Sequence, residues 1–275
     1  MKDLWLCAQL DIIESLRARW FWVYSLIFGG IVALLLVFGL TESRVFGFTG
    51  LSRLLITYIQ LCMAILPVFV LISTVRSVAG DREAGVFEYL LSLPVSLSGW
   101  YWGRLMGRFL AIFLPVFLAM FLAIGWGVFK GLQIPWFQVG FYIALLVVLA
   151  WCFLGLSMLI SSFARSVDIA QGLAFIVWLV LLLFLDLILL GIMIRQQLPA
   201  DTVITIALLN PLQVFRTAAM LLFDPQLVLL GPAAYLILDY FGQNGYLMYA
   251  ITYPLVLGTL SAIMGYWLFR RGDLP

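Results

Sequence analysis

Few residue types in this chain could perform chemistry, and the missing types exclude several classes of site. The 275 residues include 13 Asp and Glu, 15 Lys and Arg, three Cys and no His. His-based triads, imidazole bases and the commonest metal ligand are therefore excluded. Cys7, Cys62 and Cys152 are widely spaced and form no CxxC motif, so they indicate neither a disulfide framework nor a metal site. We predict that the chain binds no metal or cofactor and is not an enzyme.

The densest group of charges lies in residues 76–108. This segment contains seven charged residues: Arg76, Asp81, Arg82, Glu83, Glu88, Arg104 and Arg108. Because proline lacks a backbone N–H and has a fixed φ, Pro94 should end or bend the helix before it. Ser96 then offers an N-cap for the next helix. The pattern predicts a short helix, a break and a second helix, an element that a partner protein could push.

Two other polar features lie further along the chain. The short segment 161–168 contains Arg165 and is interpreted either as a plain turn capped by Ser166 or Asp168, or as a second contact surface for a soluble partner. Asp186 is a carboxylate inside an apolar run, where a charge costs about 2.5 to 3.5 kcal/mol at the bilayer centre. It is interpreted as a structural polar clasp, as part of a pathway or substrate site, or as the sign of a misplaced span boundary.

The composition determines which solvent must surround these elements. The chain is 65% hydrophobic and only 10% charged, whereas a soluble domain has about 25% charged residues. The surrounding solvent is therefore lipid. A net charge of +2 is too small to indicate a nucleic-acid partner. One integral membrane domain over residues 1–275 follows.

Six apolar runs have the length that a ~30 Å hydrocarbon core requires. They are residues 20–40, 54–75, 109–129, 137–160, 169–194 and 249–269. They lack the alternation of barrel strands, so they are predicted to be helices, and the fold class is all-α and polytopic.

The distribution of Lys and Arg predicts the orientation. With a cytoplasmic N-terminus, the inner side holds ten: Lys2, Arg17, Arg19, Arg76, Arg82, Arg104, Arg108, Arg165, Arg270 and Arg271. The outer side holds five: Arg44, Arg53, Lys130, Arg195 and Arg216. Both termini are therefore expected to be cytoplasmic.

Two further segments are apolar but do not have the form of simple spans. Residues 1–19 place leucines at helical spacing, with Asp11, Glu14 and Arg17 off that stripe, which favours an interfacial amphipathic helix over a solvated lead-in. Residues 195–248 contain apolar stretches too short to cross, interrupted by prolines. They are predicted to be short helices that re-enter the outer leaflet. An additional spanning hairpin, giving eight helices, stays open.

The segment Gly80-Asp-Arg-Glu-Ala-Gly85-Val-Phe-Glu88-Tyr-Leu-Leu-Ser-Leu-Pro94-Val-Ser96, followed by Gly103-Arg-Leu-Met-Gly107, resembles the signature of ABC-2 type permeases. Arg104 stands where Lys is commoner in that family, which leaves the charge unchanged. The resemblance implies a homodimer paired with two copies of an ABC ATPase that binds the ATP and Mg. It implies these ATPase-coupling residues: Asp81, Arg82, Glu83, Gly85, Glu88, Pro94, Ser96 and Arg165.

Three shorter matches resemble the permeases of nitrous-oxide reductase maturation transporters, a subgroup of the same family. They are Leu-Arg17-Ala-Arg19-Trp20, Leu-Asp186-Leu-Ile-Leu-Leu and Leu-Leu-Asn210-Pro211-Leu-Gln-Val-Phe-Arg216. This resemblance implies a bacterial inner-membrane protein that acts on a periplasmic maturation protein during copper-site assembly. Asn210, Pro211 and Arg216 would then lie near that partner. The alternatives are a generic exporter of a lipid, glycan or drug-like substrate, and a scaffold that transmits mechanical work without moving a solute.

Overall fold

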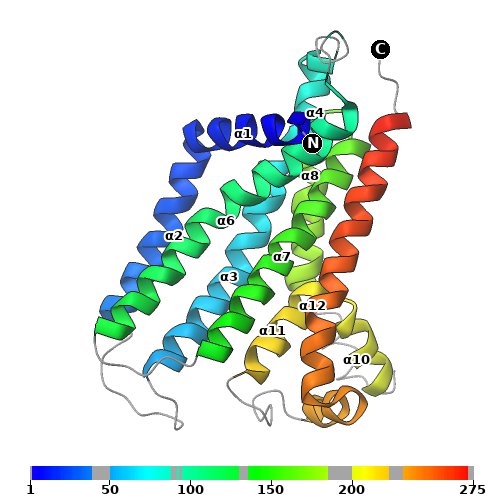
Figure 1. Cartoon of the computed structure of the whole chain (residues 1–275). Helices are drawn as coiled ribbons and strands as arrows, with labels where there is room; N and C mark the ends of the chain where they lie inside the picture. Colours follow the sequence, from blue (N-terminus) through cyan, green and yellow to red (C-terminus); the bar gives the residue numbers. More distant parts are fainter. Residues whose placement is uncertain are drawn as a thin grey trace.

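The protein is an α-helical bundle (Figure 1). The computed structural model describes residues 2–38, 50–87, 92, 95–129, 136–184, 200–222 and 232–271, and contains no strand within these ranges. The helices are α1 (Lys2–Arg17), α2 (Arg19–Phe38), α3 (Gly50–Thr74), α4 (Arg76–Glu83), α6 (Leu97–Phe129), α7 (Trp136–Phe163), α8 (Val167–Leu179), the π-helix η1 (Val180–Phe184), α10 (Ala200–Leu208), α11 (Pro211–Leu221) and α12 (Pro232–Arg271). The predicted all-α class is confirmed.

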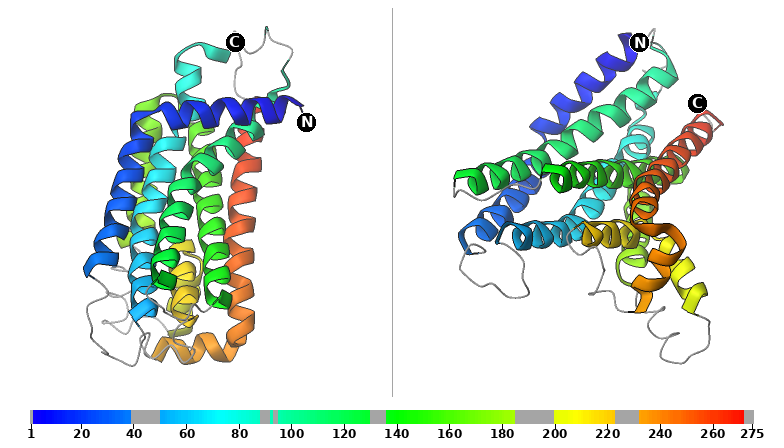
Figure 2. Two further views of the ribbon diagram at one scale, coloured as in Figure 1. Left: turned by 60° about the vertical axis from the view of Figure 1, so that its left-hand side comes forward. Right: turned by 60° about the horizontal axis from the view of Figure 1, so that its bottom comes forward.

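Among the described residues, four helical stretches are long and apolar enough to cross a membrane: Leu61–Glu83, Leu97–Trp126, Trp136–Phe163 and Ile237–Arg271. The helices α2 and α8 run alongside them in the same bundle (Figures 1 and 2). The polytopic membrane fold predicted from the apolar runs is therefore confirmed. The first described residues and the end of α12 lie at the same end of the bundle.

The helix α1 lies across that end of the bundle, nearly at right angles to the spans (Figure 2). Its apolar residues Leu6, Leu10 and Ile13 are 57%, 65% and 47% exposed, whereas Ala8 and Asp11 are buried. The apolar stripe thus faces outward and the small and acidic residues face the protein. An outward apolar stripe on a transverse helix fits the interfacial position expected for residues 1–19.

Two helices are longer than the apolar runs indicate. The helix α6 begins at Leu97, 12 positions before the predicted start at residue 109. Its 33 residues rise about 50 Å, so its first turns extend beyond the hydrocarbon core. The helix α12 begins at Pro232 and contains a kink at Gly242, whose φ of 64° is rarely adopted by other residues. The sequence predicts short re-entrant helices across residues 195–248, whereas residues 232–248 form the kinked first part of α12.

Within the segment predicted to contain short helices, the described residues 200–221 form two of them. The helices α10 and α11 have 9 and 11 residues and rise about 14 and 17 Å, which is too short to cross the membrane. Pro211 occupies the first turn of α11, where its missing N–H costs nothing. The described part of the chain therefore favours re-entrant helices over an additional spanning hairpin.

The helices α7 and α12 form the most extensive contact among the described elements. Their backbones touch at two glycines, because a Cβ on Gly258 would lie 2.6 Å from the Cα of Cys152 and a Cβ on Gly155 would overlap the carbonyl group of Gly258. Farther along the pair, Gly265 meets Leu159 in the same way. Small residues let membrane helices approach closely, since burial of apolar surface does not drive their association in lipid.

Candidate coupling site

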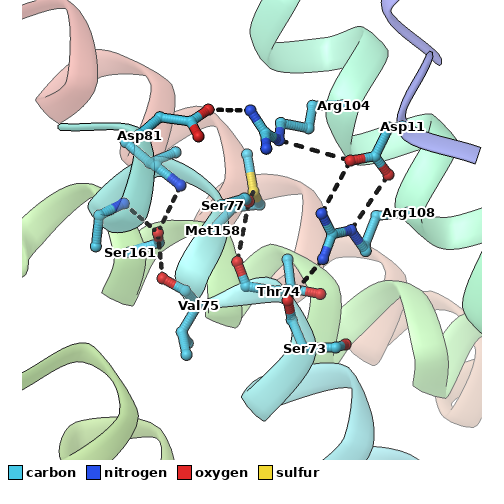
Figure 3. A network of polar contacts seen from close by, with 12 residues as sticks. Asp11, Ser73, Thr74, Val75, Ser77, Asp81, Arg104, Arg108, Met158 and Ser161 are labelled. Atoms are coloured by element: carbon cyan, nitrogen blue, oxygen red, sulfur yellow. Dashed lines mark hydrogen bonds and ion pairs between the residues drawn. The ribbon is translucent and has the colours of Figure 1, made fainter. Parts of the chain in front are cut away.

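The helices α3 and α4 form one rod that is interrupted at Val75. A serine of α7 forms hydrogen bonds with the backbone at this interruption (Figure 3). The Oγ of Ser161 accepts hydrogen bonds from the backbone N–H groups of Val78 and Ala79, both at 3.0 Å, and donates to the carbonyl of Val75 at 2.6 Å. The two N–H groups are among those that a helix start leaves without partners. One buried hydroxyl therefore joins α4 to α7.

We expect Ser161→Ala to destabilise the protein by about 1 to 3 kcal/mol, because it leaves buried backbone groups with no acceptor or donor. The matched control is Ser162→Ala, since the Ser162 hydroxyl donates to the carbonyl of Met158 in its own helix and interacts with the Tyr101 side chain, rather than with the backbone of α4. The measurement is the melting temperature of both purified variants in detergent. Equal melting temperatures would show that the Ser161 hydroxyl does not stabilise the interruption at Val75.

An ionic network connects α4 with α6 and α1 (Figure 3). Asp81 of α4 pairs with Arg104 of α6, and the same arginine lies 3.5 Å from Asp11 of α1. Asp11 also accepts two hydrogen bonds from Arg108, at 2.9 and 3.2 Å. The Nη1 of Arg108 donates to the carbonyl of Ser73 at 2.7 Å. Because the side chain of Asp11 is 3% exposed, it forms the buried centre of the network.

The next two residues of α4 hold both sides of the turn between α7 and α8. Arg82 donates to the carbonyls of Ala164 and Ser162, at 3.1 and 3.5 Å. Glu83 accepts from the backbone N–H of Val167 at 3.1 Å. The cation thus meets the carbonyl end of one helix and the carboxylate meets the N–H end of the next, as helix dipoles favour.

The structure shows the local form of segment 161–168, while its contact with a soluble partner stays a prediction. Ser166 caps α8 by accepting from Ile169, so the plain-turn interpretation is right about the local structure. Arg165 is exposed on this turn, beside the residues that Arg82 and Glu83 bind. The two segments predicted to meet a partner are therefore adjacent in space.

The break predicted at Pro94 lies outside the described residues, and only the residues that flank it are described. Gly85 ends the first helix with a φ of 68°, and the Oγ of Ser96 accepts from the N–H of Gly99 at 3.2 Å, as its predicted N-cap role requires. Glu88 and Pro94 lie outside the described residues. Past the break, Gly103 and Gly107 let α1 approach α6, because a Cβ at either position would lie 2.6 Å from a carbonyl oxygen of α1.

Phe87, which follows the end of α4, lies in an aromatic cluster. Its ring lies 5.4 Å from that of Trp100 in α6 and 5.3 Å from that of Phe269 in α12. The rings of Trp100 and Phe269 stack on each other at 5.4 Å. All three residues are buried. The segment that begins at α4 is therefore also packed against the last helix of the chain.

At the opposite end, the side chain of Asn210 connects α11 with η1. It is 1% exposed, caps α11 by accepting from Leu212 at 3.0 Å, and donates to the carbonyl of Leu181 in η1 at 2.6 Å. The hydroxyls of Tyr249 and Tyr253 in α12 bind the carbonyls of Leu208 and Leu209. Irregular backbone inside a membrane needs such partners. These contacts therefore position residues 208–210 at the junction of α10 and α11, which we call the tip.

The residues predicted to contact a periplasmic partner are thus mostly internal. Asn210 and Pro211 are buried, and Arg216 is half-buried. In this conformation Asn210 holds the tip, and the partner contact itself stays a prediction. Asp186 lies outside the described residues.

Three residues at the centre of the site were not selected by sequence reasoning: Asp11, Arg108 and Ser161. A signal exists for Asp11, since Ala8, Asp11 and Ser15 share the face of α1 opposite its leucine stripe, and small residues on one face indicate close packing. Arg104 and Arg108 lie one residue after Gly103 and Gly107, so the same helical repeat places both arginines beside α1.

Comparisons with known proteins identify the family of this chain. The model of the ABC-2 family transporter proteins matches residues 5–274. The "Probable ABC transporter permease protein NosY" of Stutzerimonas stutzeri is 25% identical over 228 residues, covering 78% of this chain and 80% of that protein. The protein of the same name from Pseudomonas aeruginosa is 25% identical over 230 residues, covering 82% and 84%. Together with the helical bundle and its transverse first helix, the match over nearly the whole chain shows that this protein belongs to the ABC-2 family of transporter permeases.

Proposed function

We propose that this permease receives mechanical work from a separate ABC ATPase chain at α4 and passes it to the opposite side of the membrane. Two copies of the permease would pair with two ATPase copies, which bind ATP and Mg. The end that carries α1 and α4 would face the cytoplasm of a bacterium, as the ten cytoplasmic Lys and Arg residues favour.

The observation that carries the proposal is that three consecutive side chains of α4 bind three different helices. Asp81 binds α6, Arg82 binds the end of α7 and Glu83 binds the start of α8. A push on α4 would therefore displace several spans together, because rigid contacts transmit a motion that a flexible loop would absorb.

Two routes connect α4 with the tip between α10 and α11. The first runs from Phe87 through Phe269 to α12, whose Tyr249 and Tyr253 hold the tip. The second runs from Glu83 to α8 and η1, whose Leu181 carbonyl binds Asn210. Because π-helical turns occur often at functional sites, η1 is a suitable place for one helix to change its shape. The tip would respond when α8 and α12 move relative to each other.

The finer proposal is that this motion acts on a periplasmic partner in the copper-site maturation of nitrous-oxide reductase. The similarity to two NosY permeases supports it. Reconstitution distinguishes it from a generic exporter. ATP-dependent change in the partner protein without solute flux would support mechanical action, whereas flux of a lipid, glycan or drug-like solute would support export.

We expect Arg82→Gln combined with Glu83→Gln to uncouple ATP hydrolysis from motion at the tip. The variant should still insert and bind the ATPase, because Asp81 and Ser161 continue to hold α4. Spin labels at the exposed positions Leu209 and Phe137 report the distance from the tip to the start of α7. In the reconstituted complex, ATP should change this distance in the parent protein and not in the variant, at a similar rate of ATP hydrolysis.

Asp168→Asn is the matched control, since Asp168 is an exposed carboxylate on the same turn. It should leave the ATP-dependent change intact. If the Arg82 and Glu83 variant moved like the parent protein, the contacts of these two side chains with the turn between α7 and α8 would not transmit the motion. Failure of chemical crosslinks to join residues 81–87 to an ATPase would remove the proposal as a whole.

A further inference from the structure

A cavity of about 580 Å³ lies between the α3–α4 rod and the corner where α1 meets α2. One wall is a single face of the rod, whose lining residues recur at three- and four-residue intervals: Phe69, Ile72, Ser73, Arg76, Gly80 and Asp81. The facing wall includes Glu14, Ala18 and Trp20. The cavity therefore extends along the rod from inside the bundle to its α1 end.

The lining changes from apolar to charged along the rod. Phe69 and Ile72 belong to the membrane-spanning part of α3, and Arg76 and Asp81 follow on α4. The helix α1 marks the level of the membrane surface, because Leu10 and Ile13 point outward and Glu14 comes next. A cavity with an apolar lower part and a charged upper part at this level suits an amphipathic molecule. It suits a segment of a soluble partner poorly, since such a segment would have to enter as far as Phe69.

The charges in the lining leave one cation and one anion without partners. Asp81, Arg104 and Arg108 belong to the ionic network, and Glu83 binds the N–H of Val167. Among the described residues, no ion pair engages Arg76 or Glu14, and both are exposed. The ligand that complements this pair carries a phosphate for Arg76 and an ammonium group for Glu14.

We propose that the cavity binds a phospholipid whose head group combines a phosphate with a primary ammonium, drawn from the leaflet on the α1 side. Arg76 binds the phosphate and the carboxylate of Glu14 accepts from the ammonium, while the acyl chains lie along Phe69 and Ile72. A quaternary ammonium has no N–H to donate to Glu14. An anionic head group places its charge against Glu14 with no compensating cation of its own.

Native mass spectrometry of the full chain tests the proposal. Delipidated protein is titrated separately with phosphatidylethanolamine, phosphatidylcholine and phosphatidylglycerol, and one tightly retained phosphatidylethanolamine per chain is expected. Arg76→Gln and Glu14→Gln should each weaken that binding about fivefold to tenfold, because each removes one charge-assisted contact. Glu14→Gln should also reduce the preference for phosphatidylethanolamine over phosphatidylcholine.

Two controls keep the experiment decisive. Arg270→Gln and Asp168→Asn remove exposed charges that do not line the cavity, and they should leave lipid retention unchanged. Melting temperatures identify any variant that fails to fold. Equal retention of all three lipids, or unchanged binding by both cavity variants, overturns the proposal. Crosslinks that place an ATPase segment beside Phe69 overturn it too, because the cavity would then belong to the partner protein.

Discussion

Gly155→Ala is expected to prevent α7 and α12 from packing as they do in this structure, at a cost of at least about 3 kcal/mol. The added methyl group would overlap the carbonyl group of Gly258, and its distance to that carbonyl carbon would be 2.6 Å. The obstacle is backbone, so no side-chain rotation relieves the clash and the two helices must separate. Their separation also disturbs the contacts of Tyr249 and Tyr253 with the tip.

Gly140→Ala is the matched control, because it makes the same change in the same helix. A Cβ at Gly140 has open space, and alanine favours a helix over glycine by about 1 kcal/mol. The control should therefore be neutral or slightly stabilising. Expression level, size-exclusion profile and melting temperature in detergent measure both effects. If the Gly155→Ala protein had the same melting temperature as the Gly140→Ala protein, this result would contradict the close approach of α7 and α12.

Asp11→Ala is expected to destabilise the protein by about 3 to 5 kcal/mol, the range observed when one member of a buried ion pair is removed. The variant would leave Arg108, whose side chain is 9% exposed, without its carboxylate, and Arg104 with Asp81 alone. Since Asp11 is the member of the network that belongs to α1, loss of the carboxylate should also detach α1 from α6. The measurement is unfolding of the variant in mixed micelles, with limited proteolysis of residues 2–17.

A second substitution separates the buried charge from simple loss of contact. Adding Arg108→Leu to Asp11→Ala should recover part of the lost stability, because the double variant no longer buries that unpaired cation. Asp3→Asn is the control in the same helix, since Asp3 forms only exposed contacts with Ser96. It should cost less than about 1 kcal/mol. A loss for Asp11→Ala no greater than for Asp3→Asn would mean that the network does not hold α1.

The sequence predicted the charged element and its break, but not what its charges bind. The positions of Gly85 and Ser96 follow from local backbone chemistry, which a few neighbouring residues determine. The partners of Asp81, Arg82 and Glu83 lie 23, 82 and 84 positions away along the chain. A pattern of charges does not contain such pairings, because they depend on which helices become neighbours.

The sequence alone determined that this protein crosses a membrane as helices, where most spans lie, and that a transverse amphipathic helix precedes them. These features follow from hydrophobic length and periodicity, which act locally and do not need a partner segment. Only the tertiary structure decided that Asp11 is buried, that Ser161 forms hydrogen bonds with the backbone where α3 and α4 are interrupted at Val75, and that Asn210 faces inward. In lipid the pairing of helices depends on close fit and on satisfied polar groups, and both are properties of surfaces that meet only after folding.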